Sequence, residues 1–346
     1  PNIALDIVQE LYSDVPFIYI DIRSVLSAII MEFELFDLHV SREQLAHDIV
    51  GLSLLGGNDF VIELPFTKMK YNDSMKILIN GYKRVLECNS DDEWRLVVKE
   101  DIDVPFRFNW SFLQKLFSVL ASSEWHHLNK KKRRMLNYRP RSTDKSDPVT
   151  DLEKAIADTH IFMHKPYYAP EHPLYNVFMY YLNRVNLNQN EEEWKSEYYI
   201  HYLDMSPDII DQSYQKEKLT IDYIQSLMFT LNYYLDQLPS WEYTYKYSYS
   251  PLPSDLVSAM DSISDIDQLY SFNKGNPVSP LVQLITVLPN GSSILPINYR
   301  NTGVNTVDPK RLKLNIKVSD KHVYTEPILG PIDIEKAKNI VNGSDI

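Results

Sequence analysis

Residues Leu45 to Pro65 read LAHDIVGLSLLGGNDFVIELP, and this stretch sets the expectations for the rest of the chain. An apolar segment with helical spacing ends at Gly56-Gly57-Asn58, because glycine and asparagine favour the end of a helix. Asp59 follows directly, at the exposed edge of an apolar element. A carboxylate in this place is typical of a metal site for phosphate chemistry, but an aspartate can also simply end a helix. The rest of the sequence is needed to choose between a metal ligand and a helix-ending aspartate.

The composition is that of an acidic protein able to bury a large core. The sequence has 346 residues, 44% of them hydrophobic and 24% charged, with a formal net charge of −12. A global positive field for nucleic-acid binding is therefore excluded, and such binding would need a local groove or bound cations. The single cysteine, Cys88, allows neither an internal disulfide nor a cysteine zinc site. The chain has neither an apolar run of about 18 residues nor a signal peptide, which predicts an intracellular, cytoplasmic protein.

Helical periodicity dominates the pattern. Helices are predicted over Ile22–Phe36, Ser41–Leu55, Ser74–Leu86, Phe108–Ala121, Glu191–Leu203, Asp208–Leu235 and Pro280–Leu288. Ser41 and Gln44 form a capping box for the second of these, and Asp333 is expected to cap a final helix. Arg311–Val318 alternates as a strand does, and His322–Thr325 is expected to return as its hairpin partner.

The first residues have the pattern of a segment that lies inside a folded domain. Phe17–Ile22, FIYIDI, is expected to form a buried strand, and Asp21 or Ser24 can cap the helix after it. Little sequence precedes this strand, so we expect the chain to enter its fold part-way through.

One segment is strongly basic and runs into a polar stretch that is typical of a linker. Its cations are Lys130, Lys131, Lys132, Arg133 and Arg134. A cation near a nucleic-acid backbone adds salt-sensitive affinity, so these side chains are candidate phosphate contacts. The alternative is a solvated helix end that has no partner.

The segment Ser240–Asp255, SWEYTYKYSYSPLPSD, is the densest aromatic stretch. Five rings alternate over the nine residues from Trp241 to Tyr249. A packed strand explains this spacing, and packing is the commoner use of such rings. A groove on which bases stack also explains it, at about 1–3 kcal/mol per base.

Five blocks of the sequence occur in an informative order. They are IYIDIRSVL at 18–26, HDIVGLSLLGGNDFVIELP at 47–65, the long run at 223–256 that contains SWEYTYKYSYSPLPSDL, Phe272–Pro296, and LGPIDIEKA at 329–337. Together they resemble the XRN-type 5′→3′ exoribonuclease family, whose conserved region holds G-N-D-F, S-W-x-W and S-D-L segments in this order. The order and the coverage of most of the chain make the resemblance specific.

The resemblance implies a fold and a set of site residues. It implies an α-rich α+β protein, with the C-terminal part of a PIN/flap-nuclease-like α/β core at 1–124 and a basic, polar linker at 125–165. A mostly helical XRN-like second conserved region with a small β-hairpin would occupy 166–346. Asp59 matches an aspartate that binds catalytic Mg²⁺ in the family. Trp241 matches a tryptophan that stacks on RNA, and Tyr243 stands where the family has a second tryptophan and keeps a ring that can stack, so both are candidate stacking residues. Ser250 stands where the family has an alanine.

The implied chemistry is metal-dependent phosphodiester hydrolysis on RNA that bears a 5′-monophosphate. The family's other metal-binding carboxylates lie N-terminal to where this chain begins, and one carboxylate cannot hold a Mg²⁺ pair. Two hypotheses follow. Either the chain is the C-terminal part of an exoribonuclease, inactive alone and completed by an N-terminal nuclease chain. Or it is a catalytically incomplete structural or interaction protein, for example a virion or ribonucleoprotein component.

Overall fold

The computed structural model describes much of the chain, in two compact units. The described residues are 21–33, 35, 40–67, 72–88, 95–101, 103–128, 191–289, 291–304, 313–318, 323–328 and 332–343. The units are Pro1–His47 and Asp48–Ile346. The basic run at 130–134 and most of the expected strand at 17–22 lie outside the described residues.

The first unit contains helix α2 (Ile22–Glu32). Asp21 caps it, since its side chain accepts a hydrogen bond from the Arg23 backbone N–H at 3.0 Å, as predicted. The helix is shorter than expected, ending at Glu32 rather than Phe36. A glutamate in the last turn is unfavourable there, because the C-terminal end of a helix carries partial negative charge.

The remaining helices are α3 (Arg42–Leu54), α4 (Asn72–Glu87), α5 (Trp110–Ala121), α9 (Glu191–Leu203), α10 (Ile209–Leu235), α11 (Pro253–Ser262), α12 (Pro280–Val287) and α13 (Ile334–Val341). All but α11 and α13 lie close to their predicted bounds; α13 follows its predicted cap, and α11 was not predicted. The caps explain the agreement: Gln44 N–H donates to the Ser41 hydroxyl oxygen at 3.2 Å, and the side chains of Asp208 and Asp333 accept first-turn N–H groups of α10 and α13.

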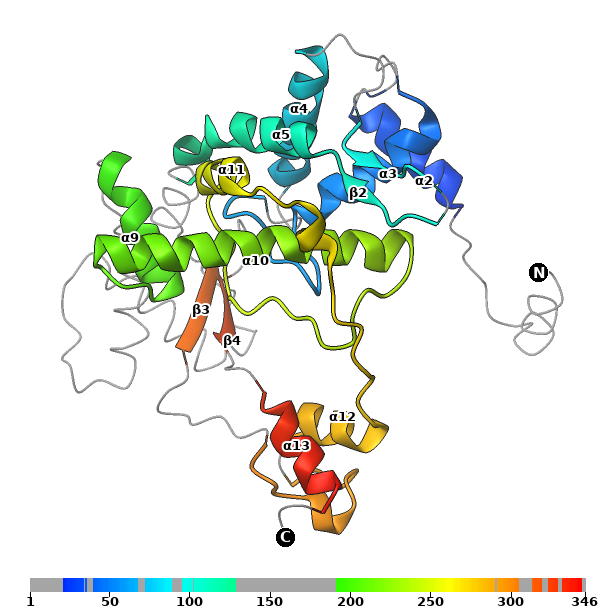
Figure 1. Cartoon of the computed structure of the whole chain (residues 1–346), viewed down its shortest axis with the longest axis vertical. Helices are drawn as coiled ribbons and strands as arrows, with labels where there is room; N and C mark the ends of the chain where they lie inside the picture. The colour runs from blue at the N-terminus through cyan, green and yellow to red at the C-terminus, as the bar shows by residue number, and fades with distance from the viewer. Residues whose placement is uncertain are drawn as a thin grey trace, which may run out of the picture. The chain divides into compact units, whose positions relative to one another are not determined.

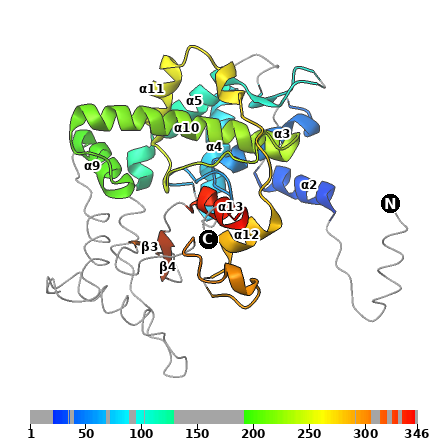
Figure 2. The same cartoon turned by 60° about the horizontal axis from the view of Figure 1, so that its bottom comes forward.

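The core of the second unit is a stack of helices around α10. Helix α5 packs between α4 and α11, and α11 packs against α10, which also contacts the 3₁₀ turn η1 (Asp267–Tyr270) (Figures 1 and 2). The short antiparallel strands β1 (Val97–Val98) and β2 (Arg107–Phe108) pair beside α10. The architecture is mostly helical, and among the described residues no helix is both long and apolar enough to cross a membrane.

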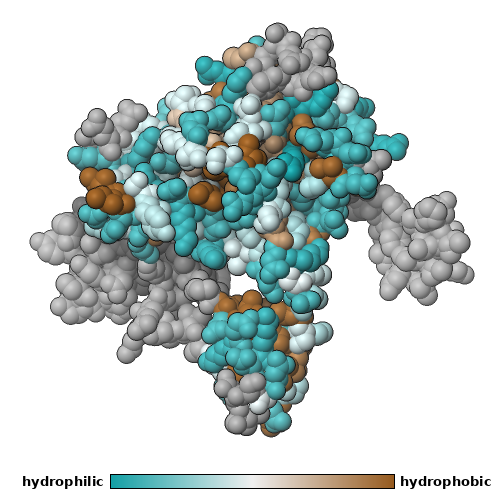
Figure 3. Space-filling view, viewed as in Figure 1, coloured by the Kyte–Doolittle hydropathy of each residue, from teal (hydrophilic) through white to brown (hydrophobic). Residues whose placement is uncertain are grey.

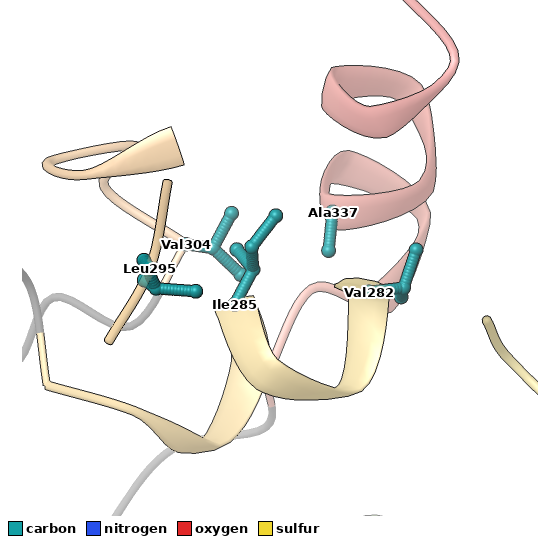
Figure 4. Close-up of a cluster of buried hydrophobic side chains, with 5 residues drawn as sticks. All are labelled: Val282, Ile285, Leu295, Val304 and Ala337. Carbon is teal, nitrogen blue, oxygen red and sulfur yellow. The ribbon is translucent and has the colours of Figure 1, made fainter. Parts of the chain in front are cut away.

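The last part of the chain contributes a small helical pair and a hairpin. Helices α12 and α13 pack together, and their shared core is drawn in Figure 4. It consists of Val282, Ile285, Leu295, Val304 and Ala337. Strands β3 (Lys313–Val318) and β4 (Val323–Ile328) form the predicted antiparallel hairpin. In the space-filling view of Figure 3, apolar side chains also remain visible on the surface over these C-terminal helices.

Candidate active site

The turn after α3 has a backbone that only glycine fits. Gly57 has φ +84°, in the left-handed region that favours glycine. A Cβ added there would lie 2.8 Å from the Glu63 backbone nitrogen and 3.0 Å from its carboxylate. The returning chain therefore passes directly over Gly57, and a side chain at this position would displace it.

Asn58 then folds the backbone into a tight loop. Its side-chain oxygen accepts hydrogen bonds from the backbone N–H groups of Phe60 at 2.8 Å and Val61 at 2.9 Å. Its own N–H donates to the Val61 carbonyl at 2.8 Å. Asp59 lies at the tip of this loop and is exposed to solvent, as the sequence predicted.

The loop is anchored on both sides to residues far away in the sequence. The Phe60 ring lies 4.5 Å from that of Tyr233 and 6.0 Å from that of Phe229, both on α10. The Tyr223 hydroxyl donates to the Ile62 carbonyl at 3.1 Å, and the Ser250 hydroxyl donates to the Glu63 carbonyl at 2.6 Å. The position of Asp59 is thus fixed by α10 and by the aromatic segment.

Asp48, at the start of the matching segment, has a different role from Asp59. It is fully buried and accepts hydrogen bonds from the Tyr82 hydroxyl at 2.7 Å and from the Val97 N–H at 2.8 Å. Burial, reinforced by the negative charge of Asp48, raises the pKa of Tyr82 far above its ordinary value. Asp48 therefore joins α3 to α4 and β1.

The described residues do not complete a metal site around Asp59. Within those ranges, no three histidine, cysteine, aspartate or glutamate side chains are grouped so that they could hold a metal ion. Mg²⁺ takes close to six oxygen ligands, several of which can be water. Asp59 can supply one ligand, so the described residues alone do not fit a catalytic pair of Mg²⁺ ions.

The aromatic segment is extended but forms no strand. Tyr243 packs against Phe229 and Phe272, with ring centroids 4.8 and 5.2 Å apart, and its hydroxyl donates to the Asp222 carbonyl at 3.1 Å. Burial raises the pKa of Tyr243 well above its usual range. Trp241, by contrast, is 54% exposed. Of the two predicted stacking residues, Trp241 has an accessible ring and Tyr243 is largely engaged in packing.

A second segment holds the exposed Trp241 in place. Its backbone N–H donates to the Lys274 carbonyl at 2.8 Å. Gly275, with φ +58°, lies against the side chain of Glu242, where an added Cβ would come within 2.5 Å of the carboxylate carbon. The Ser240 hydroxyl oxygen accepts the N–H groups of Glu242 and Tyr243. The backbone at Trp241 is thus held by several hydrogen bonds.

The residues that sequence reasoning missed form a buried polar network. The buried Glu124 carboxylate accepts hydrogen bonds from the Ser254 N–H at 3.1 Å and hydroxyl at 2.7 Å, and pairs with Lys195 at 2.9 Å. Next to it, Asp255 accepts the Tyr199 hydroxyl at 2.7 Å. Ser254 and Asp255 belong to the S-D-L segment noted above, which was the available signal for their importance.

Comparison with known proteins supports the predicted relationship over part of the chain. Residues 180–307 match the family model described as the Xrn1 helical domain. The chain is 36% identical over 114 residues to 5′-3′ exoribonuclease 1 of Saccharomyces cerevisiae, 33% over 117 residues to 5′-3′ exoribonuclease 2 of Gallus gallus, and 30% over 118 residues to 5′-3′ exoribonuclease 1 of Homo sapiens. These matches cover 33%, 33% and 34% of the chain, but only 7%, 11% and 6% of the respective relatives. The predicted resemblance to XRN-type 5′→3′ exoribonucleases is confirmed over this third of the chain, which is similar to the helical domain of that family.

Proposed function

We propose that this chain forms part of a 5′→3′ exoribonuclease and that Asp59 supplies one oxygen ligand to its Mg²⁺ site. The observation that carries the proposal is the construction of the turn around Asp59. The positive φ of Gly57, the two N–H groups accepted by Asn58 and the anchoring of Phe60 on α10 together hold the loop that presents Asp59 to solvent. Such a rigid, exposed carboxylate is suited to a preorganised ligand.

The remaining ligands must come from elsewhere. We place them in segments outside the described residues or in a separate N-terminal nuclease chain, so that the described part is inactive by itself. In this proposal residues 1–124 complete a PIN/flap-nuclease-like core, 125–165 form a linker, and 166–346 form the helical region. When bound, Mg²⁺ would supply charge stabilisation and water activation for phosphodiester hydrolysis.

The proposed substrate is RNA with a 5′-monophosphate. Trp241 offers an exposed ring to a base, and Tyr243, which packs against Phe229, is the second proposed stacking residue. The basic residues Lys130, Lys131, Lys132, Arg133 and Arg134 are proposed to contact phosphates, which would offset locally the net charge of −12.

Replacing Asp59 tests this proposal. In Asp59→Asn, the loop keeps its shape but loses a charged ligand, so Mg²⁺-dependent degradation of 5′-monophosphorylated RNA should fall to background. The assay uses the purified chain with any subunit that copurifies, followed by gel electrophoresis of end-labelled RNA with Mg²⁺ or with a chelator. Asp103→Asn makes the same change at another exposed loop residue and should leave degradation unchanged. Full activity in Asp59→Asn would refute the role of Asp59.

The second candidate is a structural or interaction protein without catalysis. The observation that favours it is the lack of a carboxylate cluster within the described ranges. This candidate predicts that RNA stays intact with and without Mg²⁺, and that no copurifying subunit restores degradation. Reconstituted, Asp59-dependent degradation would exclude it.

A further inference from the structure

A cavity of about 450 Å³ lies beside the Asp59 turn, between the last turns of α3 and α10. Its wall consists of Val50, Ser53, Leu54, Gly57, Asn58, Tyr234 and Leu235. Gly57 and Asn58 line the cavity, so it lies next to the turn that carries Asp59, although Asp59 itself is not in its wall. Its volume lies within the range of about 300–1,000 Å³ that is usual for small-molecule sites.

The electrostatics of the cavity discriminate among the parts of a nucleotide. Helix α3 ends at Leu54 and α10 ends at Leu235, so two C-terminal helix ends, each with partial negative charge, border the same space. An anionic phosphate is disfavoured there. A neutral group that carries N–H donors is favoured, and the exocyclic amino group and ring edge of a nucleobase have this character.

The lining side chains suit a flat aromatic ligand. The Tyr234 side chain is 52% exposed, which leaves ring surface on which a base can stack, and Val50 and Leu54 add apolar surface. The Asn58 side-chain oxygen is occupied by two backbone N–H groups, so its NH₂ group is what this side chain can offer to a ligand.

We infer that this cavity binds a nucleobase of the RNA, with Tyr234 as the stacking residue. The inference rests on the proposed function and extends it: the base belongs to a nucleotide close to the phosphate that is processed near Asp59. Because the two helix ends disfavour an anionic phosphate, the base occupies the cavity and the phosphate backbone of the RNA lies outside it.

The experiment measures binding rather than catalysis. Isothermal titration calorimetry without Mg²⁺ uses the purified protein with 5′-AMP, adenosine and ribose 5-phosphate as probes. We expect 5′-AMP and adenosine to bind and ribose 5-phosphate not to bind. Tyr234→Ala should weaken 5′-AMP binding by about five- to 150-fold, the loss of one stacked base, while Tyr234→Phe should retain it. Ser53→Leu, which fills the cavity, should also abolish binding.

The matched control is Tyr214→Ala, because Tyr214 is 70% exposed on the first turns of the same helix and does not line the cavity. Its binding should equal that of the unmodified protein. Equal binding of ribose 5-phosphate and 5′-AMP would overturn the inference. So would the absence of adenosine binding, or unchanged affinity in both Tyr234→Ala and Ser53→Leu with circular dichroism showing folded protein.

The two proposals fail in different ways. If Asp59→Asn degrades RNA normally while 5′-AMP binding still depends on Tyr234, the metal role of Asp59 is refuted and the base site stands. If Asp59→Asn abolishes degradation while Tyr234→Ala leaves the affinity for 5′-AMP unchanged, only the base site is refuted.

Discussion

Asp48 and Asp59 show how one residue type serves two opposite purposes within a single short stretch. Asp48 is buried and satisfies a tyrosine hydroxyl and a backbone N–H, so it stabilises the junction of α3 with α4 and β1. Asp59 is exposed on a loop shaped by glycine and asparagine. Both lie in the stretch at 47–65 that resembles the family's segment, and only their surroundings separate the structural aspartate from the candidate ligand.

Asp48→Asn should therefore destabilise the protein. Asparagine is isosteric but uncharged, and it presents an N–H group where two donors need acceptors, so we expect a loss of about 2–4 kcal/mol in the free energy of unfolding. Urea unfolding followed by circular dichroism measures it. Asp59→Asn is the matched control and should change stability by less than about 0.5 kcal/mol. Equal effects of the two substitutions would contradict the buried role of Asp48.

Departures from the family pattern are accommodated by new hydrogen bonds. Ser250 stands where the family has an alanine, and its buried hydroxyl donates to the Glu63 carbonyl at 2.6 Å. Tyr243 stands in place of a tryptophan, and its hydroxyl donates to the Asp222 carbonyl. Because each hydroxyl is satisfied, these changes leave the aromatic segment packed against α10 and the Asp59 loop.

At the scale of elements, a buried ion pair joins helices on both sides of a long undescribed stretch. Glu124 follows α5 and Lys195 lies in α9, and both contact Ser254 at the start of α11. Beside them, the rings of Trp125 and Trp194 lie 5.2 Å apart. The described segments that end at residue 128 and begin at residue 191 thus lie next to each other.

Glu124→Gln tests this junction. The substitution removes the charge partner of Lys195 and one of the acceptors for Ser254, and because Lys195 is partly solvated we expect a loss of about 1–3 kcal/mol. Glu335→Gln is the control, because the Glu335–Lys338 pair lies on the surface and its loss should leave the thermal midpoint nearly unchanged. Thermal denaturation of the two variants compares them directly. A similar shift in both would show that burial of Glu124 adds nothing.

At the scale of the whole chain, the contact between Glu124 and Lys195 predicts that the protein still folds when the basic segment 130–165 is deleted. Deleting 130–165 leaves 166–190 to connect points that the Glu124–Lys195 pair holds together, and these 25 residues can span up to about 80 Å when extended. The thermal midpoint should stay within a few degrees of that of the full chain. A large fall in it would show that 130–165 is part of the folded core.

The same deletion tests the proposed phosphate contacts. Each cation that contacts single-stranded nucleic acid adds about 0.7 to the slope of log affinity against log salt. The deletion removes ten cations, and loss of the five proposed contacts among them should lower the slope by up to about 3.5. RNA binding measured by fluorescence anisotropy at several salt concentrations gives this slope. An unchanged slope would leave Lys130–Arg134 without a role in binding RNA.

The buried tyrosines should make the whole molecule sensitive to alkaline pH. Burial raises the pKa values of Tyr82, Tyr199 and Tyr223 well above the ordinary value of 10.0. Below about pH 10 both states keep these protons, and stability does not depend on them. Above about pH 10 the unfolded chain releases protons that the folded protein retains, so stability falls as pH rises, by about 1.4 kcal/mol per pH unit for each tyrosine.

Urea unfolding near pH 8 and near pH 11 measures this alkaline loss, and tyrosinate absorbance follows ionisation. Three tyrosines together should lower the free energy of unfolding by about 4 kcal/mol between pH 8 and pH 11. If all tyrosines ionise while the circular dichroism spectrum stays native, these pKa values are not raised and the prediction fails.

The sequence by itself determined the helices and the exposed place of Asp59, because caps, periodicity and glycine turns act between residues that are near neighbours in the chain. Helix α9 has its predicted bounds, and α10 begins directly after its predicted cap, Asp208. Only the tertiary structure decided that Asp48 is buried, that Tyr243 packs while Trp241 is exposed, and that a cavity adjoins the turn that carries Asp59. Each of these depends on contacts with residues distant in the chain, such as Tyr82, Phe272 and Tyr234, and burial by distant segments leaves no periodic trace in the local sequence.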